Sequence, residues 1–148
     1  MDLKEKRILV SLIATVVIFT VYVWYVYSRS VAGNIEIIND FHFWGRSFLI
    51  LIPVGIVTQI VIQIVFAISH KITTGEDPDA IDDERDKLIE LKAIKISHYI
   101  FITGFALAMG SLTLRMQPWV MFVVLISSGF VATIVNEIVR LYFYRKGV

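Results

Sequence analysis

The sequence predicts an all-α integral membrane protein: a four-helix bundle of two tandem two-helix hairpins, with the N and C termini cytoplasmic. Three observations support this prediction. Hydrophobic residues make up 57% of the 148 residues and mean hydropathy is +0.73, whereas soluble domains average about 45–50% apolar residues. The apolar residues are concentrated in four long runs. The basic residues gather in alternate segments between these runs.

The four runs are each long enough to cross a bilayer as a helix. A run of about 20 residues spans roughly 30 Å, the thickness of the hydrocarbon core. Backbone groups in that layer must be paired internally, which favours helices although Ile and Val are abundant. The first run is longer than a signal-peptide core and ends in aromatic residues, so we expect it to be retained. The predicted spans are 8–27, 48–69, 94–114 and 119–142.

Basic residues indicate the orientation of these spans. Cytoplasmic segments of membrane proteins are enriched in Lys and Arg. The two terminal segments and the central connection carry eleven basic residues, whereas the other two connections carry only Arg29, Arg46 and Arg115. We therefore expect both termini and the central connection to face the cytoplasm. The predicted location is the bacterial cytoplasmic (inner) membrane, with the lipid bilayer as the first partner.

A repeated charged phrase suggests an internal duplication. "DLKEKRI" (2–8) and "DERDKLI" (83–89) share one pattern, and each precedes an outward-going span. The returning spans are also similar, in "GIVTQIVIQIVFAISHK" (55–71) and "GFVATIVNEIVRLYFYR" (129–145). Similarity at a fixed period is typical of repeats, although two amphiphilic helix starts could match by coincidence. We expect one membrane domain, 1–148, with repeat-like halves 1–72 and 79–148 and a cytoplasmic linker 73–82.

Local signals predict the segments between the spans. Gly75 is a turn residue, and Pro118 suits the first turn of the fourth helix. The third helix is expected to start near Asp82, where several acids offer N-caps. "IEIINDFHFW" (35–44) mixes polar and apolar residues and is expected to lie flat at the outer interface.

Parts of the chain resemble a family of small bacterial four-helix membrane proteins known only as a domain of unknown function. The resemblance rests on "DERDKLIELKAIKISHYIF", "FALAMGSLTLRMQPWVM", "LYFYRKGV" and the opening "LKEKRILVSLIATVVIFTVYVW". It implies a four-span fold but no activity, cofactor or catalytic residue. Members of that family often lie beside small helix-turn-helix regulators in their genomes, which implies a protein partnership.

Composition argues against several function classes. The 14 basic and 13 acidic residues nearly balance, so direct nucleic-acid binding is not expected. The chain has no Cys, and no nucleophile–base pair or metal-ligand set is visible in the sequence. We therefore expect no enzyme activity, no cofactor and no metal site. His70 and His98 leave a haem or metal site as a minor alternative.

Polar residues within the spans form a candidate intramembrane site. Gln59 lies about 17 Å from the outer end of its span, near the predicted midplane, and Gln63 is one turn further. Interhelical hydrogen bonding is the simpler interpretation of these residues, and a polar pathway is the alternative. Glu137 lies near the cytoplasmic edge, where Arg140 could clamp it or where it could bind a proton or cation. The candidate residues are Gln59, Gln63, His98, Asn136, Glu137 and Arg140.

The charged phrase before the third span is a candidate docking surface. A salt-bridged, solvated helix start is the simpler interpretation of its alternating charges. If the hairpins are repeats, equivalent charges lie at equal depth, so Lys4 should reach Asp86, or Arg85 should reach Glu5. The candidate docking residues are Asp83, Glu84, Arg85, Asp86 and Arg145.

Small residues in the third span predict close helix packing. Gly104, Ala108 and Ser111 share one helix face, and small residues at such spacing let helix backbones approach. A second small pair, Ala106 and Gly110, could serve another chain. We therefore expect a homo-oligomer, with a dimer favoured.

Two function classes fit these expectations. The first is a non-enzymatic scaffold or regulatory membrane protein with a cytoplasmic protein partner. The second is a small homo-oligomeric transporter or channel that uses Gln59, Gln63 and Glu137. A dry, filled core would favour the first, and a continuous polar cleft reaching Gln59 would favour the second.

Overall fold

The computed structural model describes residues 3–30, 35–75 and 84–146 and consists of four long helices and one short 3-10 helix. The elements are α1 (Leu3–Ser30), η1 (Ile35–Asn39), α2 (Phe41–Thr74), α3 (Glu84–Thr113) and α4 (Pro118–Lys146). All four α-helices are long and apolar enough to cross a membrane. The all-α class is therefore confirmed for the described residues, and each predicted span lies in a helix long and apolar enough to cross a membrane.

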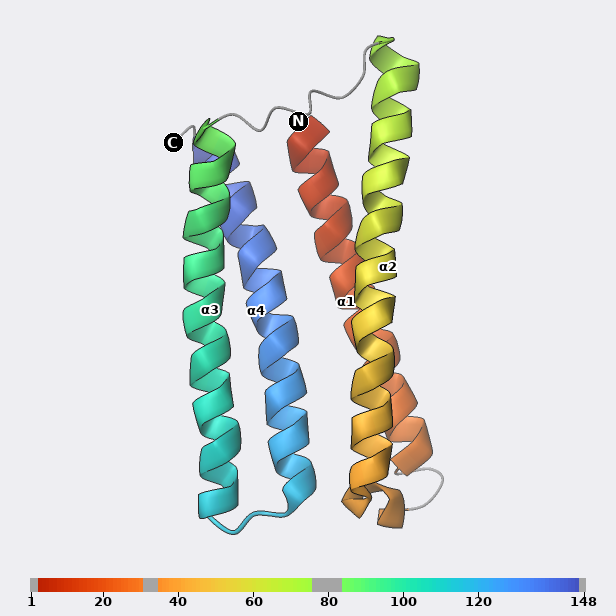
Figure 1. Cartoon of the computed structure of the whole chain (residues 1–148), viewed down its shortest axis with the longest axis vertical. Coiled ribbons are helices and arrows are strands. Elements are labelled where there is room, and N and C mark those ends of the chain that lie inside the picture. The colour runs from red at the N-terminus through yellow and green to blue at the C-terminus, as the bar shows by residue number, and fades with distance from the viewer. Residues whose placement is uncertain (1–2, 31–34, 76–83, 147–148) are drawn as a thin grey trace.

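The helices alternate in direction, so one end of the molecule carries both chain ends (Figure 1). At this end, called here the terminal end, α1 and α3 begin and α2 and α4 finish. α3 packs along α4, α4 also contacts α1, and α1 contacts α2. α2 has no comparable contact with α3 or α4. α4 is therefore the central helix, and α2 is attached mainly through α1.

The α3–α4 contact is close because small residues face each other. Gly104 and Ala108 are buried on α3, as are Ser128 and Ala132 on α4. A Cβ added at Gly104 would lie only 2.1 Å from the Cβ of Ser128. The buried serine hydroxyls donate to carbonyls of their own helix, Ser111 to Ala108 and Ser128 to Leu125, which satisfies them in apolar surroundings. The predicted packing face of Gly104, Ala108 and Ser111 is thus buried within the chain.

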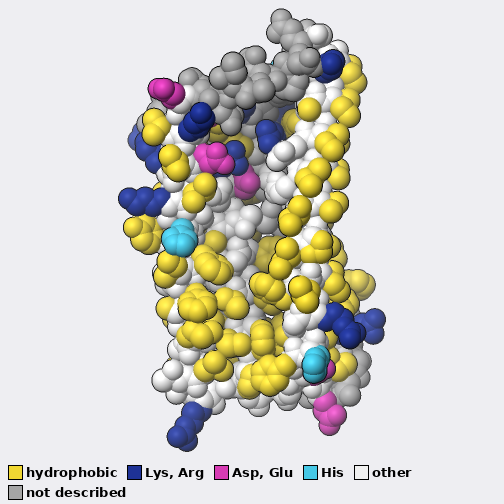
Figure 2. Space-filling view, viewed as in Figure 1, with side chains coloured by type: hydrophobic (Ala, Val, Ile, Leu, Met, Phe, Trp, Pro, Cys, Tyr) yellow, Lys and Arg dark blue, Asp and Glu magenta, His cyan; other side chains and the backbone are white. Residues whose placement is uncertain are grey.

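The other faces of the helices are apolar and exposed. Only 6% of the most hydrophobic stretch of α2 is buried, against 22% in α1. A large apolar surface of this kind is what lipid contacts in membrane proteins. Figure 2 shows apolar side chains over the middle of the molecule and along its right-hand side, with charged side chains at both ends. Ala106 is exposed and Gly110 half-buried, so the second small pair is not used inside the chain.

The segment before α2 differs from its prediction. α2 begins at Phe41, seven residues earlier than the predicted span, because Asp40 caps the helix by accepting a hydrogen bond from the His42 amide. Only residues 35–39 form the short η1. The Trp44 indole donates to the Ile38 carbonyl at 2.8 Å and stacks on Phe122 of α4. The expected interfacial segment 35–44 is therefore partly helix α2.

The predicted turn at Gly75 and the predicted helix start at Pro118 are both present, and the third predicted boundary lies outside the described residues. Gly75 ends α2 with φ of 73°, and its amide donates to the Lys71 carbonyl. α4 begins at Pro118, preceded by a turn in which Arg115 takes a left-handed φ of 55°. The expected helix start at Asp82 lies outside the described residues, and α3 is helical from Glu84. The duplication stays a prediction.

The Gly104–Ser128 contact predicts a large effect from adding one methyl group. Gly104→Ala should lower the free energy of unfolding by about 1–3 kcal/mol, because the new Cβ overpacks a tight interface. Gly110→Ala is the matched control, since nothing lies within 4 Å of its added Cβ. Thermal unfolding in detergent, followed by circular dichroism, measures both.

Adding Ser128→Gly to Gly104→Ala should restore much of the stability, because it removes the atoms that clash. Equal unfolding temperatures for Gly104→Ala and Gly110→Ala would contradict the close helix approach.

Candidate functional site

A polar cavity of about 190 Å³ lies between α1, α2 and α4, with one further wall residue from α3. In Figure 2 charged side chains surround a hollow near the terminal end, above the apolar surface. Cations, acids, amides and hydroxyls line the cavity together with two isoleucines. The lining residues are Lys4, Arg7, Ile8, Ser11, Gln59, Ile62, Gln63, Glu90, Glu137, Arg140 and Tyr144.

A chain of hydrogen bonds joins the three helices at the deep end of this cavity. The Gln59 amide donates to the Ser11 hydroxyl at 2.9 Å, and that hydroxyl donates to Glu137 Oε1 at 3.0 Å. Ser11 is buried because it shares a face of α1 with Ile8 and Thr15, also buried. The Thr15 hydroxyl is satisfied by the Ser11 carbonyl at 3.0 Å. Gln59 thus forms the interhelical hydrogen bond expected of it.

Glu137 is buried with incomplete hydrogen bonding. Its side chain is only 9% exposed, and Oε2 accepts no hydrogen bond. Arg140 Nη1 lies 3.8 Å from Oε2, an ion pair but too long for a hydrogen bond. The Arg140 Nε is likewise buried without an acceptor. The predicted Glu137–Arg140 pair is present, and it leaves one acceptor and one donor unused beside the cavity.

A second polar cluster closes the terminal end of the cavity. The Lys4 ammonium forms an ion pair with Asp86, and the Tyr144 hydroxyl donates to the other carboxylate oxygen of Asp86 at 2.8 Å. This cluster, called here the Asp86 clamp, ties α1, α3 and α4 together. The predicted contact between Lys4 and Asp86 is confirmed. Asp86 is buried, however, so its assignment to an accessible docking surface is wrong: its carboxylate is used inside the protein.

The remaining docking candidates are exposed or outside the described residues. Glu84 and Arg85 are exposed at the start of α3, and Arg145 is exposed at the end of α4. Asp83 lies outside the described residues.

The structure brings together four of the six predicted intramembrane residues. Gln59, Gln63, Glu137 and Arg140 all line the polar cavity. His98 and Asn136 instead line a separate pocket between α3 and α4, where the Asn136 amide donates to the Ser97 hydroxyl at 3.3 Å. His98 is exposed there. Its expected grouping with the glutamines is wrong, because His98 lines the pocket between α3 and α4 and the α3 residue at the polar cavity is Glu90.

The hydrogen bonds of the cavity set the level of Gln59 relative to its neighbours. Its hydrogen bond to Ser11 places it one helical turn, about 6 Å, from the level of Arg7. Glu137 is similarly about 4.5 Å from the level of Arg140. Gln59 and Glu137 therefore lie about one turn from the cations of the cavity. The predicted depth of Gln59 in a bilayer stays a prediction.

Sequence reasoning missed Ser11, Arg7, Glu90 and Tyr144 as cavity residues. Ser11 had a local signal, since Ser11 and Thr15 are hydroxyl residues one turn apart in an otherwise branched apolar run. Tyr144 had none, because only the folded chain brings it to Asp86.

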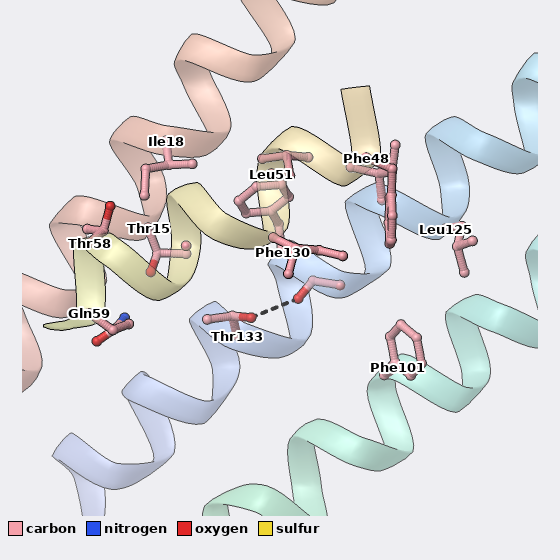
Figure 3. Close-up of a pocket in the computed structure, with 14 residues that line it drawn as sticks. Thr15, Ile18, Phe48, Leu51, Thr58, Gln59, Phe101, Leu125, Phe130 and Thr133 are labelled. Atoms are coloured by element: carbon pink, nitrogen blue, oxygen red, sulfur yellow. Dashed lines mark hydrogen bonds between the residues drawn. The ribbon is translucent and has the colours of Figure 1, made fainter. Parts of the chain in front are cut away.

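An apolar cavity of about 420 Å³ adjoins the polar one, and Gln59 lines both. It extends between α1, α2 and α4, with Phe101 contributed by α3 (Figure 3). Thr15, Gln59 and Thr133 lie toward one end of the view, and Phe48 and Leu125 toward the other. Gln59 and Phe48 are eleven residues apart on α2, so the cavity extends about 16 Å along the helix.

No three His, Asp or Glu side chains within 3–30, 35–75 and 84–146 are grouped as a metal site. Comparison with family models, curated proteins and solved structures finds no match. The resemblance to the family of small four-helix membrane proteins therefore stays an expectation, and the site itself must support any functional proposal.

The Asp86 clamp predicts an uneven effect of removing neighbouring acids. Asp86→Asn should lower the free energy of unfolding by about 1–3 kcal/mol, because the buried carboxylate bonded to Lys4 and Tyr144 loses its charge. Glu84→Gln is the matched control, as Glu84 is exposed two residues away. Chemical unfolding in mixed micelles measures the difference. Similar midpoints for the two variants would contradict a structural role for Asp86.

Proposed function

We propose that this chain is a non-enzymatic, multi-pass protein of the bacterial cytoplasmic membrane that binds a small ligand in its polar cavity and acts as a regulatory or scaffold partner. The observation that carries the proposal is the pair of unused polar atoms, Glu137 Oε2 and Arg140 Nε, buried beside the polar cavity. Buried polar groups without partners are costly. A ligand that accepts a hydrogen bond from Arg140 Nε and donates one to Glu137 Oε2 would remove that cost.

The position of the cavity supports a link between ligand and partner. Lys4 and Tyr144 line the cavity and also hold Asp86. Asp86 is adjacent in sequence to Arg85, which is exposed on the same turn of α3. A ligand that shifts Lys4 or Tyr144 would therefore act on the start of α3. We propose this exposed face, with Glu84, Arg85 and Arg145, as the surface for a cytoplasmic protein partner.

The cavity supports binding better than conduction. Its polar lining reaches Gln59, but the adjoining cavity is lined by Phe48, Phe101, Phe130 and other mainly apolar residues. Polar groups along a whole pathway are typical of transporters. A polar lining that stops at Gln59 favours a binding site open to one side.

The proposal predicts that a small molecule is retained with the protein. The chain extracted in polymer nanodiscs should show by native mass spectrometry a bound mass that is lost in Arg140→Gln. Arg145→Gln is the matched control, because it removes the same charge from the same helix outside the cavity lining. No bound mass in the native protein, or equal retention by both variants, would contradict the proposal.

The orientation predicts how the two ends react with a membrane-impermeant thiol reagent. The chain has no Cys, so a single introduced Cys reports its own position. Arg115→Cys, in the turn between α3 and α4, should react from outside intact cells. Lys87→Cys should react only after the inner membrane is opened. The opposite pattern would reverse the proposed topology.

A further inference from the structure

We propose that the ligand of the polar cavity is a lysophospholipid: an amphiphile with a single acyl chain, a free hydroxyl next to that chain and a phosphate head group. This inference rests on the proposed function and names the chemical class of its ligand. It follows from the order in which three chemically different layers succeed one another from the interior of the molecule toward the terminal end.

The innermost layer fits an acyl chain. The 420 Å³ cavity is lined mostly by aliphatic and aromatic side chains and lies within the typical range of ligand sites, about 300–1,000 Å³. Space remains between its α2 and α4 walls because α2 packs mainly on α1. Gly55 and Gly129 both line the cavity, and a Cβ added at either position would meet no atom within 4 Å. A chain from the surrounding lipid would occupy this space.

The middle layer lacks a hydrogen-bond donor. Gln59 lines both cavities, and its amide is used by Ser11, whose hydroxyl is used by Glu137 Oε1. Glu137 Oε2 accepts no hydrogen bond, in a side chain that is 9% exposed. A ligand hydroxyl next to the acyl ester, between the chain and the phosphate, would donate a hydrogen bond to this oxygen.

The outer layer of the cavity carries an excess of cations, Lys4, Arg7 and Arg140 against the single acid Glu90. Arg140 Nε, about one turn beyond Glu137, is buried and makes no hydrogen bond. Arg7 lines the same layer, is exposed and forms no ion pair within the described part of the chain. Lys4 adds a third cation at the cavity wall. Basic pockets between helix ends at the cytoplasmic side are typical binding sites for phosphate head groups.

The order of the layers distinguishes this ligand from others. A fatty acid would leave Glu137 Oε2 without a donor, and so would a diacyl phospholipid, whose second hydroxyl is esterified. A hydrophobic amine would pair with Glu137 but leave Arg7 without an anion and the Arg140 Nε without an acceptor. Chain, hydroxyl and phosphate, in that order, match all three layers.

A lipid competition experiment tests the inference. Delipidated protein in dodecyl maltoside is mixed with oleoyl lysophosphatidic acid, dioleoyl phosphatidic acid or oleate at equal concentration, and bound masses are measured by native mass spectrometry. The lysolipid should bind at least about tenfold more tightly than either competitor, the effect of one well-placed hydrogen bond to a charged group. Equal binding of phosphatidic acid or oleate would overturn the role of the hydroxyl.

Variants test the layers separately. Glu137→Gln should reduce the preference for the lysolipid over phosphatidic acid, since an amide at that position donates where the carboxylate accepts. Gly55→Leu should weaken lysolipid binding by filling the chain cavity, whereas Gly110→Leu, an open position outside both cavities, should not. Unchanged binding in Gly55→Leu would overturn the chain site.

Inorganic phosphate and glycerol 3-phosphate distinguish a head-group site from a lipid site. Neither should displace the lysolipid at tenfold excess, and displacement would overturn the lipid assignment. If the native protein carries a bound mass that is not a lysolipid, this inference fails while the proposed binding function stands. If it binds none of these molecules and retains no native ligand, both fail.

Discussion

The need to satisfy the buried carboxylate of Glu137 determines how the helices meet. A carboxylate that leaves water must gain ion-pair or hydrogen-bond partners. Glu137 gains them from Ser11 of α1, at 3.0 Å, and from Arg140 one turn along its own helix. The Ser11 hydroxyl in turn accepts from Gln59 of α2. One buried charge therefore sets the register of α1, α2 and α4 at a common level.

The two hairpins differ in how closely they pack, and this difference creates the cavities. Gly104 and Ser128 bring α3 and α4 into close contact along their length. No comparable pair of small residues joins α1 to α2 in the described contacts, and α2 buries little of its apolar stretch. Space remains between α2 and α4, apolar toward Phe48 and polar toward Arg7. The tight hairpin supplies a rigid wall, and the loose one supplies room for a ligand.

The Asp86 clamp connects this cavity to the surface of the protein. Asp86 belongs to a strongly charged phrase, yet it is buried by Lys4 from α1 and Tyr144 from α4. Exposed ion pairs contribute only about 0–1 kcal/mol, so a partly buried clamp is the more effective way to hold the start of α3. Because Lys4 and Tyr144 also line the cavity, the same two side chains face both the proposed ligand and the proposed docking surface.

The sequence by itself determined the four helices, since long apolar runs have only one way to satisfy their backbone in lipid. It also predicted the packing face around Gly104, because small residues at helical spacing let helices approach closely. The matching charges of the two phrases predicted the Lys4–Asp86 contact. Tertiary structure alone decided the level of Gln59 and the separation of His98 from the glutamines. Both features depend on how one helix is shifted and rotated relative to its neighbour. Shifting a helix by one turn changes no local pattern in the sequence. Ser11 became part of the site for the same reason: the partners of its hydroxyl, Gln59 and Glu137, lie 48 and 126 residues away along the chain.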